Sequence, residues 1–214
     1  MRYESFDKDH YYKISGSAPI SNSLFLDDED KVRFIFLLIH LQSPIRIYNS
    51  AWYTLRFLKK GAFPLAEKRV LQIVKNRGID LLTFCLLPEK FELILRNREE
   101  KMLSVYMHRV LTAYSKYFNA KYSKKGHVFA GPFGAARLLA TELAAASAEI
   151  HSAPRRLLAD TSTPLEDYLW SSYQDHIKAN RWGKLFSPDV VLGKFKNENE
   201  YKKFVENWVA KKPS

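Results

Sequence analysis

The chain contains almost no cysteine and no long apolar run. Cys85 is the single cysteine in 214 residues, so the chain can form neither an internal disulfide nor a cysteine-based zinc site. No window approaches the eighteen consecutive apolar residues that a membrane span needs. The N-terminal segment MRYESFDKDH is charged where a signal peptide would be apolar. These absences predict a reduced, cytoplasmic protein without a membrane partner.

Acidic residues are scarce relative to basic ones. The chain has 34 Lys and Arg against 23 Asp and Glu, a net charge of +11. A surplus of this size indicates a polyanionic partner, most often nucleic acid. The composition is otherwise that of a globular protein, with 46% hydrophobic residues, and excludes disorder and low complexity. Aromatic residues make up 14% and can stack on bases where they share a segment with cations.

The first half of the sequence predicts an antiparallel sheet. A strand is expected over 10–16, and a helix with acidic residues in its first turn over about 28–41. The segment IDLLTFCLLPEKFELILRN has two apolar stretches around Pro88 and predicts a hairpin. Its first strand has the continuous apolar run of a strand buried on both faces. Its second strand alternates, as does a strand buried on one face.

Helical patterns occupy the middle of the chain. Residues 44–78 are expected to be helical in pieces, with breaks at Gly61 and Pro64 and an end at Gly78. An apolar stripe at helical spacing runs over 99–122. A glycine-rich link, GHVFAGPFGA, then leads to a helix over about 138–152 that Pro154 is expected to end.

The C-terminal part carries three further helical signals. Thr163-Pro164-Leu165-Glu166 is a capping box with proline at the first helical position, and Ser187-Pro188-Asp189 begins a short helix. A terminal amphipathic helix has its apolar residues at Tyr201, Phe204, Val205, Trp208 and Val209. The sequence therefore predicts an α+β domain over 1–158, with a helical extension over 159–214 packed on it.

An acid-free stretch extends from Lys101 to Thr141, and aromatic residues are interleaved with its seven cations. This pattern predicts a nucleic-acid groove in which cations bind phosphates and rings stack on bases. A solvated basic helix face is the alternative interpretation. The candidate binding residues are Arg109, Lys116, Lys121, Lys124, Lys125, Arg137, Tyr114, Tyr117 and Phe129.

The order of several motifs resembles a known family. The segments YYKISGSAPISNSLFLDDED, LLPEKFELIL, AYSKYFNAKYSKKGHVFAGPF and EDYLWSSYQD are similar to successive parts of the single-tyrosine HUH transposases, in the branch of REP-associated tyrosine transposases. The resemblance covers about residues 10–208 and is looser over 42–78. It implies an HUH core, a ferredoxin-like sheet of the RRM type. It also implies a monomer or homodimer that binds hairpin or single-stranded DNA, with RNA as a variant ligand.

The family's chemistry needs residues that this chain replaces. Two histidines at i and i+2 on a strand share Mg²⁺ or Mn²⁺ with a third ligand, and a tyrosine attacks the phosphate. The resemblance places Lys90 and Glu92 at the histidine positions, Glu149 at the tyrosine position and Ala153 at the third ligand. No metal, other cofactor or strand transfer is therefore expected. Lys90 and Glu92 are expected to face the helix that carries Glu149 and to form a modest ion pair, unless they are plain surface residues.

The leading hypothesis is a transposase-like nucleic-acid-binding protein, domesticated or decayed, that no longer cuts its ligand. An active DNA transposase or nickase with a rearranged site is one alternative, in which His127 and His151 meet near Glu149. A structured-RNA binder or a protein-interaction module is another, the second docking a partner through the terminal helix. The sequence does not separate DNA from RNA.

Overall fold

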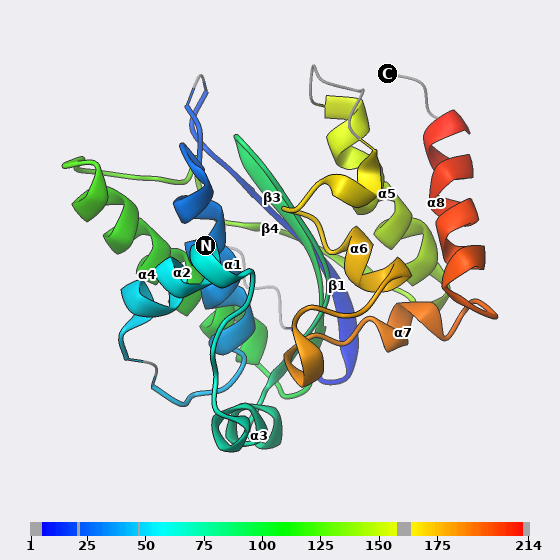
Figure 1. Cartoon of the computed structure of the whole chain (residues 1–214), viewed down its shortest axis with the longest axis horizontal. Helices are drawn as coiled ribbons and strands as arrows, with labels where there is room; N and C mark the ends of the chain where they lie inside the picture. Colours follow the sequence, from blue (N-terminus) through cyan, green and yellow to red (C-terminus); the bar gives the residue numbers. More distant parts are fainter. Residues whose placement is uncertain (1–5, 21, 47, 158–163, 212–214) are drawn as a thin grey trace.

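Four strands form one antiparallel sheet in the order β2-β3-β1-β4, and helices cover both of its faces (Figure 1). The computed structural model describes residues 6–20, 22–46, 48–157 and 164–211. The strands are β1 (His10–Ser17), β2 (Ile79–Leu87), β3 (Lys90–Asn97) and β4 (Gly134–Leu138). The helices are α1 (Asp28–His40), α2 (Ser50–Lys60), α3 (Glu67–Lys75), α4 (Met102–Lys121), η1 (Ala140–Glu142), α5 (Leu143–Leu157), η2 (Leu165–Asp167), α6 (Tyr173–Ile177), η3 (Gly183–Leu185), α7 (Asp189–Leu192) and α8 (Glu198–Lys211). The predicted α+β class is confirmed. Among the described residues, no helix has both the length and the apolar composition to cross a membrane.

Each face of the sheet packs against its own helical layer. On one face, Phe34 of α1 and Tyr106 of α4 are fully buried together with Phe91 of β3. On the other face, Ile94 of β3 is buried in the cluster that contains Tyr201 of α8. Strand β2 is buried along its whole length, as predicted. The prediction that β3 is buried on one face only is wrong at Ile94, because α5 also packs on this strand.

The helices of the first half begin and end largely where the sequence predicts. Asp27 caps α1 by accepting a hydrogen bond from the Asp30 backbone N–H at 3.0 Å, and the Asp30 carboxylate accepts from the N–H of Asp27. Helix α2 ends at Gly61, whose φ of +70° is easily reached only by glycine. Helix α3 ends at Lys75, so the prediction that Gly78 stops it is wrong.

The fourth strand is missing from the sequence prediction. The segment GAARL has low β-propensity, and the sequence predicts the end of a glycine-rich link at its first two residues and the start of a helix at Leu138, whereas α5 begins only at Leu143. It forms β4 because the edge of β1 offers unpaired backbone groups, and five residue pairs join the two strands, from Tyr11 opposite Leu138 to Ser15 opposite Gly134. Tertiary pairing therefore overrides local preference here.

Helix α5 continues past Pro154, so the prediction that this proline ends the helix is wrong. Proline removes the backbone hydrogen bond to the carbonyl four residues earlier, so the last turn of α5 needs support from packing. In the preceding turn, the Ser152 hydroxyl donates to the Glu149 carbonyl at 2.9 Å. Burial of Ala153 and Pro154 against the rest of the fold holds the last turn in place.

The C-terminal elements extend the sheet's second helical layer. The predicted boundary at 158/159 and Thr163 of the predicted capping box lie outside the described residues, and the described part resumes just before η2. The Trp-Ser-Ser-Tyr segment covers the free edge of β2: Leu86 N–H donates to the Trp170 carbonyl and Ser172 N–H to the Phe84 carbonyl, each at 2.9 Å. The short helix predicted near residue 189 is present as α7.

The terminal helix packs on its own domain (Figure 1). Tyr201 and Val205 of α8 are fully buried, and Phe204 and Trp208 pack against the same cluster. The Tyr201 hydroxyl lies 2.7 Å from both His151 Nδ1 and Ser147 Oγ, which ties α8 to α5. The apolar face of α8 is therefore occupied, contrary to the hypothesis that it docks a partner.

Candidate nucleic-acid interface

Four charged side chains meet where β1, β3 and α5 come together. The Nζ of Lys13 lies 2.7 Å from Glu149 Oε2 and 3.9 Å from Glu92 Oε1. The Nζ of Lys90 lies 3.7 Å from Glu92 Oε2, as the predicted ion pair requires. We call Lys13, Lys90, Glu92 and Glu149 the charged cluster. It confirms that Lys90 and Glu92 face the helix carrying Glu149.

Sheet register brings the charged cluster together. Ser17 pairs with Lys90 and Ser15 with Glu92, so Lys13 follows on the same face by the alternation of side chains along β1. Each of the four side chains is about one-third exposed or less. The cluster contains two ammonium groups and two carboxylates, so its formal charge is zero.

Ala153, the position implied for the third metal ligand, and His151, a member of the alternative rearranged site, are both buried rather than part of an exposed site. Ala153 of α5 is fully buried in the hydrophobic cluster that also contains Ile94 and Tyr201. His151 is also fully buried, and its Nε2 lies 2.9 Å from Ser172 Oγ, so it does not meet the exposed His127 near Glu149. Burial, with a smaller effect of nearby His176, lowers the pKa of His151 well below its usual value. Within the described ranges, no three His, Cys, Asp or Glu side chains are placed to share a metal ion.

A small pocket of about 490 Å³ adjoins the charged cluster at the end of the sheet. Ser15, Gly16 and Ser17 line one side together with Lys90 and Glu92. Gly16 is required here by close approach, because a Cβ at this position would lie 2.5 Å from the Phe91 ring. The loop 130–132 forms the opposite side.

A larger groove continues from that loop along α4. It has a volume of about 1030 Å³, and the loop 130–132 lines both this groove and the sheet-end pocket. We call it the α4 groove. Its α4 side consists of His108, Leu111, Thr112, Ser115, Lys116 and Asn119, and the facing loop adds His127 and Phe129. The loop 130–132 thus borders two depressions, the α4 groove on one side and the sheet-end pocket beside the charged cluster on the other.

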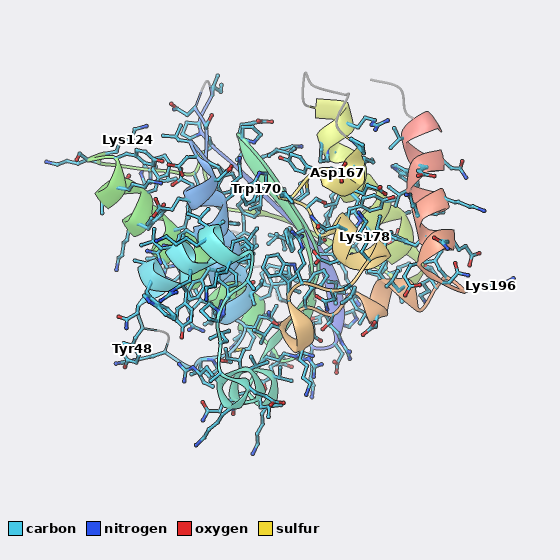
Figure 2. The ribbon with its side chains drawn as sticks, in the orientation of Figure 1. Tyr48, Lys124, Asp167, Trp170, Lys178 and Lys196 are labelled. Atoms are coloured by element: carbon cyan, nitrogen blue, oxygen red, sulfur yellow. The ribbon has the colours of Figure 1, made fainter. Side chains whose placement is uncertain are left out.

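Three of the predicted phosphate-binding cations are exposed in or next to the α4 groove. Lys116 lines the α4 groove, and Lys124 and Lys125 lie in the loop that follows α4. Figure 2 shows Lys124 at one end of the molecule, and its Nζ lies 5.3 Å from the centroid of the Phe118 ring. No ion pair is present at any of the three among the described residues.

Lys121 has a different environment from its neighbours. Its Nζ contacts three carboxylates near the start of α1, at 2.7 Å from Asp27 Oδ2, 3.0 Å from Asp30 Oδ1 and 3.2 Å from Glu29 Oε2. Burial lowers the pKa of this ammonium, but hydrogen bonds led by Asp27 outweigh that effect and raise it. Lys121 is therefore neutralised by the protein itself, contrary to its predicted phosphate contact.

The two predicted arginines also have protein partners. Arg109 donates from Nη1 to the carbonyls of Leu41, at 3.2 Å, and Ser43, at 2.7 Å, which anchors the segment after α1 to α4. Arg137 on β4 pairs with Asp7 at 3.1 Å, and both side chains are about half exposed. Because exposed pairs of this kind are weak, Arg137 can exchange Asp7 for a phosphate, whereas Arg109 is held as a structural residue.

The predicted stacking residues divide in the same way. Tyr114 is fully buried and donates its hydroxyl to the Leu24 carbonyl, so its ring is not available to a base. Tyr117 is partly buried and donates to Asp30 Oδ1 at 2.9 Å. Phe129 lines the α4 groove, with its ring edge-to-face on Phe91 at 6.1 Å between centroids. Of the three, Phe129 is placed to contact a ligand.

Sequence reasoning missed Lys13 and the polar residues along α4. Lys13 could have been found from the pairing of β1 with β3, since it lies on the same face as Ser15 and Ser17. His108, Thr112 and Ser115 recur at helical spacing and line the α4 groove. That spacing is the signal of one helix face, but only the loop packed opposite shows that the face lines a groove.

Comparisons with known proteins support the fold. No family model matches the sequence, and no curated protein matches it. A solved structure, that of "the REP associates tyrosine transposase bound to a REP hairpin", is similar with a TM-score of 0.54 and 10% sequence identity. The similarity covers 89% of this chain and 93% of that chain. At this level of identity the likeness shows the fold, and it agrees with the fold that the sequence motifs imply.

Proposed function

We propose that this protein binds hairpin or single-stranded nucleic acid along the α4 groove and does not cleave it. The observation that carries the proposal is that Lys116 and Phe129 line the α4 groove, whose loop 130–132 also borders the pocket beside the charged cluster. The groove offers a cation and an aromatic ring to a strand, while the positions implied for catalysis hold Lys–Glu ion pairs.

The α4 groove has the chemistry of a single-strand binding surface. Lys116 on its wall and Lys124 and Lys125 at its end attract the phosphate backbone, and their contacts release counterions. Phe129 can stack on a base without selecting its identity. The hydroxyl and amide groups of Thr112, Ser115 and Asn119 can bond to phosphates or sugars, which positions a strand but does not read its sequence.

The charged cluster does not fit the divalent metal of the transposase mechanism. Metal ligands must offer lone pairs, whereas Lys13 and Lys90 present ammonium groups that have none. Lys13 lies 2.7 Å from Glu149, so a cation would have to displace an existing ion pair and remain next to two positive charges. Glu149 also lacks the phenolic oxygen that a tyrosine nucleophile supplies.

The similar structure guides the choice of ligand. It holds a transposase on a REP hairpin, and we infer that a DNA hairpin with a single-stranded flank is the first ligand to test for this chain. A hairpin of the same sequence in RNA tests the variant ligand. Fluorescence polarisation of both hairpins against salt concentration gives the affinity and its salt dependence.

The decisive variant is Lys116→Ala/Lys124→Ala/Lys125→Ala. Each phosphate contact on a single strand contributes about 0.7 to the slope of log K against log salt, so losing three contacts flattens it by about 2. The matched control is Lys194→Ala/Lys196→Ala/Lys203→Ala, which removes three exposed lysines from the other side of the fold. Equal slopes for the two triple variants would refute the α4 groove as the binding surface.

A cleavage assay tests the second half of the proposal. Wild-type protein is incubated with the labelled flanked hairpin in Mg²⁺ and in Mn²⁺. We expect intact hairpin and no protein–DNA adduct on denaturing gels. Cleavage above the level of the hairpin alone would favour the alternative of an enzyme with a rearranged site.

A further inference from the structure

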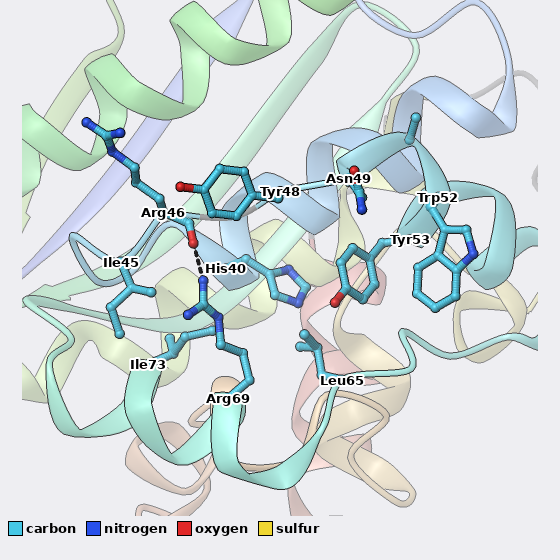
Figure 3. A pocket seen from close by; sticks show the side chains of 11 residues that line it. His40, Ile45, Arg46, Tyr48, Asn49, Trp52, Tyr53, Leu65, Arg69 and Ile73 are labelled. Atoms are coloured by element: carbon cyan, nitrogen blue, oxygen red, sulfur yellow. Dashed lines mark hydrogen bonds between the residues drawn. The ribbon is translucent and has the colours of Figure 1, made fainter.

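A pocket separate from the α4 groove lies among α1, α2 and α3 (Figure 3). Its volume is about 940 Å³, within the size range of small-molecule sites. Its lining is mainly apolar and aromatic, with two arginines and one asparagine. It belongs to the part of the sequence, residues 42–78, where the family resemblance is loosest, together with His40 of α1.

An unpartnered acceptor lies at the base of this pocket. His40 has no exposed surface, and its Nδ1 lies 2.6 Å from the Phe36 carbonyl, so Nδ1 carries the hydrogen and donates it. Its Nε2 has no hydrogen-bond partner among the described residues. Burial lowers the pKa of His40 to about 4, which keeps the ring neutral at pH 7 and leaves Nε2 with a free lone pair. A buried acceptor of this kind favours a ligand with an N–H or O–H donor.

Aromatic rings form the walls around His40. Tyr53 stacks at 6.2 Å from the His40 ring, and Trp52 meets Tyr53 edge-to-face at 5.0 Å. Trp52 is 45% exposed, with the Arg56 guanidinium 5.3 Å from its ring centroid, and Tyr48 is 71% exposed, so two large rings at the rim keep open surface. Figure 3 shows Tyr48, Tyr53 and Trp52 arranged around the opening. Rings in this arrangement can enclose a planar group by stacking.

Two guanidinium groups complete the lining. Arg69 of α3 donates one N–H to the Arg46 carbonyl, which draws the two residues together (Figure 3). Within the described part of the chain, neither Arg46 nor Arg69 forms an ion pair. The surrounding residues 42–78 contain eight Lys and Arg and one acidic residue, so the local field attracts an anion. Arginine presents a planar fork of donors that matches phosphate oxygens.

We propose that this pocket binds a single nucleotide, with the base among Tyr48, Trp52 and Tyr53 and the phosphate on Arg46 and Arg69. An amino or imino N–H of the base donates to His40 Nε2. The nucleotide is either a free nucleoside monophosphate or an unpaired residue of a bound strand, which share the same chemistry. The inference goes beyond nucleic-acid binding in the α4 groove and its first arm does not depend on it.

The first arm uses free nucleotides and the full-length chain. AMP, CMP, GMP and UMP are titrated by calorimetry, with adenosine and ribose 5-phosphate as fragments. We expect a monophosphate to bind more tightly than either fragment, since the base and the phosphate have separate subsites. Arg69→Gln should weaken binding about tenfold, the usual effect of losing a hydrogen bond to a charged group. The matched control is Lys68→Gln, its neighbour on α3, which removes the same charge outside the pocket.

The second arm uses hairpins with and without an unpaired flank. If the nucleotide belongs to a strand, Arg69→Gln weakens binding of the flanked hairpin, AMP competes with it, and the blunt hairpin is unaffected. If the nucleotide is free, AMP binds with unchanged affinity to protein saturated with hairpin. Trp52→Leu removes an exposed ring. It should weaken the same binding, of AMP or of the flanked hairpin, that Arg69→Gln weakens. Melting curves establish that each variant is folded.

The inference is overturned if Arg69→Gln behaves as Lys68→Gln does in both arms, or if neither nucleotides nor the flank contribute to binding. It survives a failure of the proposed function, because loss of hairpin binding leaves the free-nucleotide arm intact. Hairpin binding that needs Lys116, Lys124 and Lys125 but not Arg69, together with no nucleotide binding in the first arm, supports the α4 groove and rejects this pocket.

Discussion

The ammonium of Lys13 lies 2.7 Å from the carboxylate of Glu149 and joins the centre of the sheet to α5. The same ammonium is 3.9 Å from Glu92, so one lysine lies between two carboxylates next to the sheet-end pocket. This arrangement makes the region an ion-pair network. The network stabilises the fold modestly, because its members are partly exposed.

Replacement of Lys13 tests that role. In Lys13→Met the two carboxylates lose their shared cation, and we expect a loss of about 1 kcal/mol in the free energy of unfolding, a fall of about 2–4 °C in melting temperature. Lys203→Met removes an exposed lysine of α8 and should leave the melting temperature within about 1 °C. Differential scanning calorimetry measures both. A melting temperature of Lys13→Met equal to that of the wild type would mean that the ion pairs contribute nothing to stability.

A tyrosine introduced at position 149 should not by itself produce cleavage. Glu149→Tyr supplies a phenolic oxygen, but Lys90 and Glu92 would still stand at the positions that the family resemblance assigns to the metal-binding histidines, and Lys13 would lose its partner. We expect no covalent protein–DNA adduct with the flanked hairpin in Mn²⁺, as resolved by denaturing gel electrophoresis. An adduct formed by this single variant would show that the remaining residues support phosphoryl transfer.

Lys121 should affect stability more than binding. Asp30 is fully buried, and its carboxylate accepts from Lys121, Tyr117 and Tyr122. Loss of Lys121 leaves Asp30 without a cation, and we expect Lys121→Ala to lower the free energy of unfolding by about 2 kcal/mol. Urea denaturation measures this loss. Lys125→Ala removes the same charge in the exposed loop and should leave stability unchanged while weakening hairpin binding.

Substitutions of Phe129 and Tyr114 should have different effects on hairpin binding and on stability in urea denaturation. Phe129→Leu removes a ring from the α4 groove, and loss of one stacked base is expected to weaken single-strand binding about fivefold or more. Tyr114→Phe removes only a buried hydroxyl that donates to Leu24, so it should cost about 1 kcal/mol of stability and leave the affinity unchanged. If Tyr114→Phe weakened binding and Phe129→Leu did not, the binding surface would lie elsewhere.

Buried histidines should make the protein sensitive to mild acid. Burial lowers the pKa of His40 and His176 to about 4 and that of His151 well below its usual value. The unfolded chain takes up protons at these histidines below about pH 6.5, whereas the folded chain does not, so stability is full above that pH and falls as the pH drops towards 4. Each of the three histidines contributes about 1 kcal/mol per pH unit to the slope of the free energy of unfolding against pH in this range.

Urea unfolding at pH 7, 6 and 5 measures this dependence. His108→Gln/His127→Gln replaces two exposed histidines and should keep the same slope. His40→Phe, which preserves a ring in contact with Phe36, should reduce it. A pH-independent free energy of unfolding between 7 and 5 would contradict the burial of all three.

The sequence was sufficient for most of the fold. The apolar run of β2, the alternation of Phe91, Leu93 and Leu95 in β3 and the stripe along α4 correspond to local periodicities, so each element could be predicted. Strand β4 and the last turn of α5 were not predictable in this way. Pairing with β1 decided the first, and packing around Ala153 and Pro154 decided the second, against local propensity.

The sequence by itself also determined that cations and rings gather between residues 101 and 141, and that Lys90 and Glu92 share a strand face. Only the tertiary structure decided which of those cations are free. Lys121 and Lys124 lie three residues apart in the same basic stretch, yet one contacts three carboxylates at the start of α1 and the other is exposed. The difference arises because a charge is neutralised by neighbours in space, and neither the α1 carboxylates nor Lys13 lies near these residues along the chain.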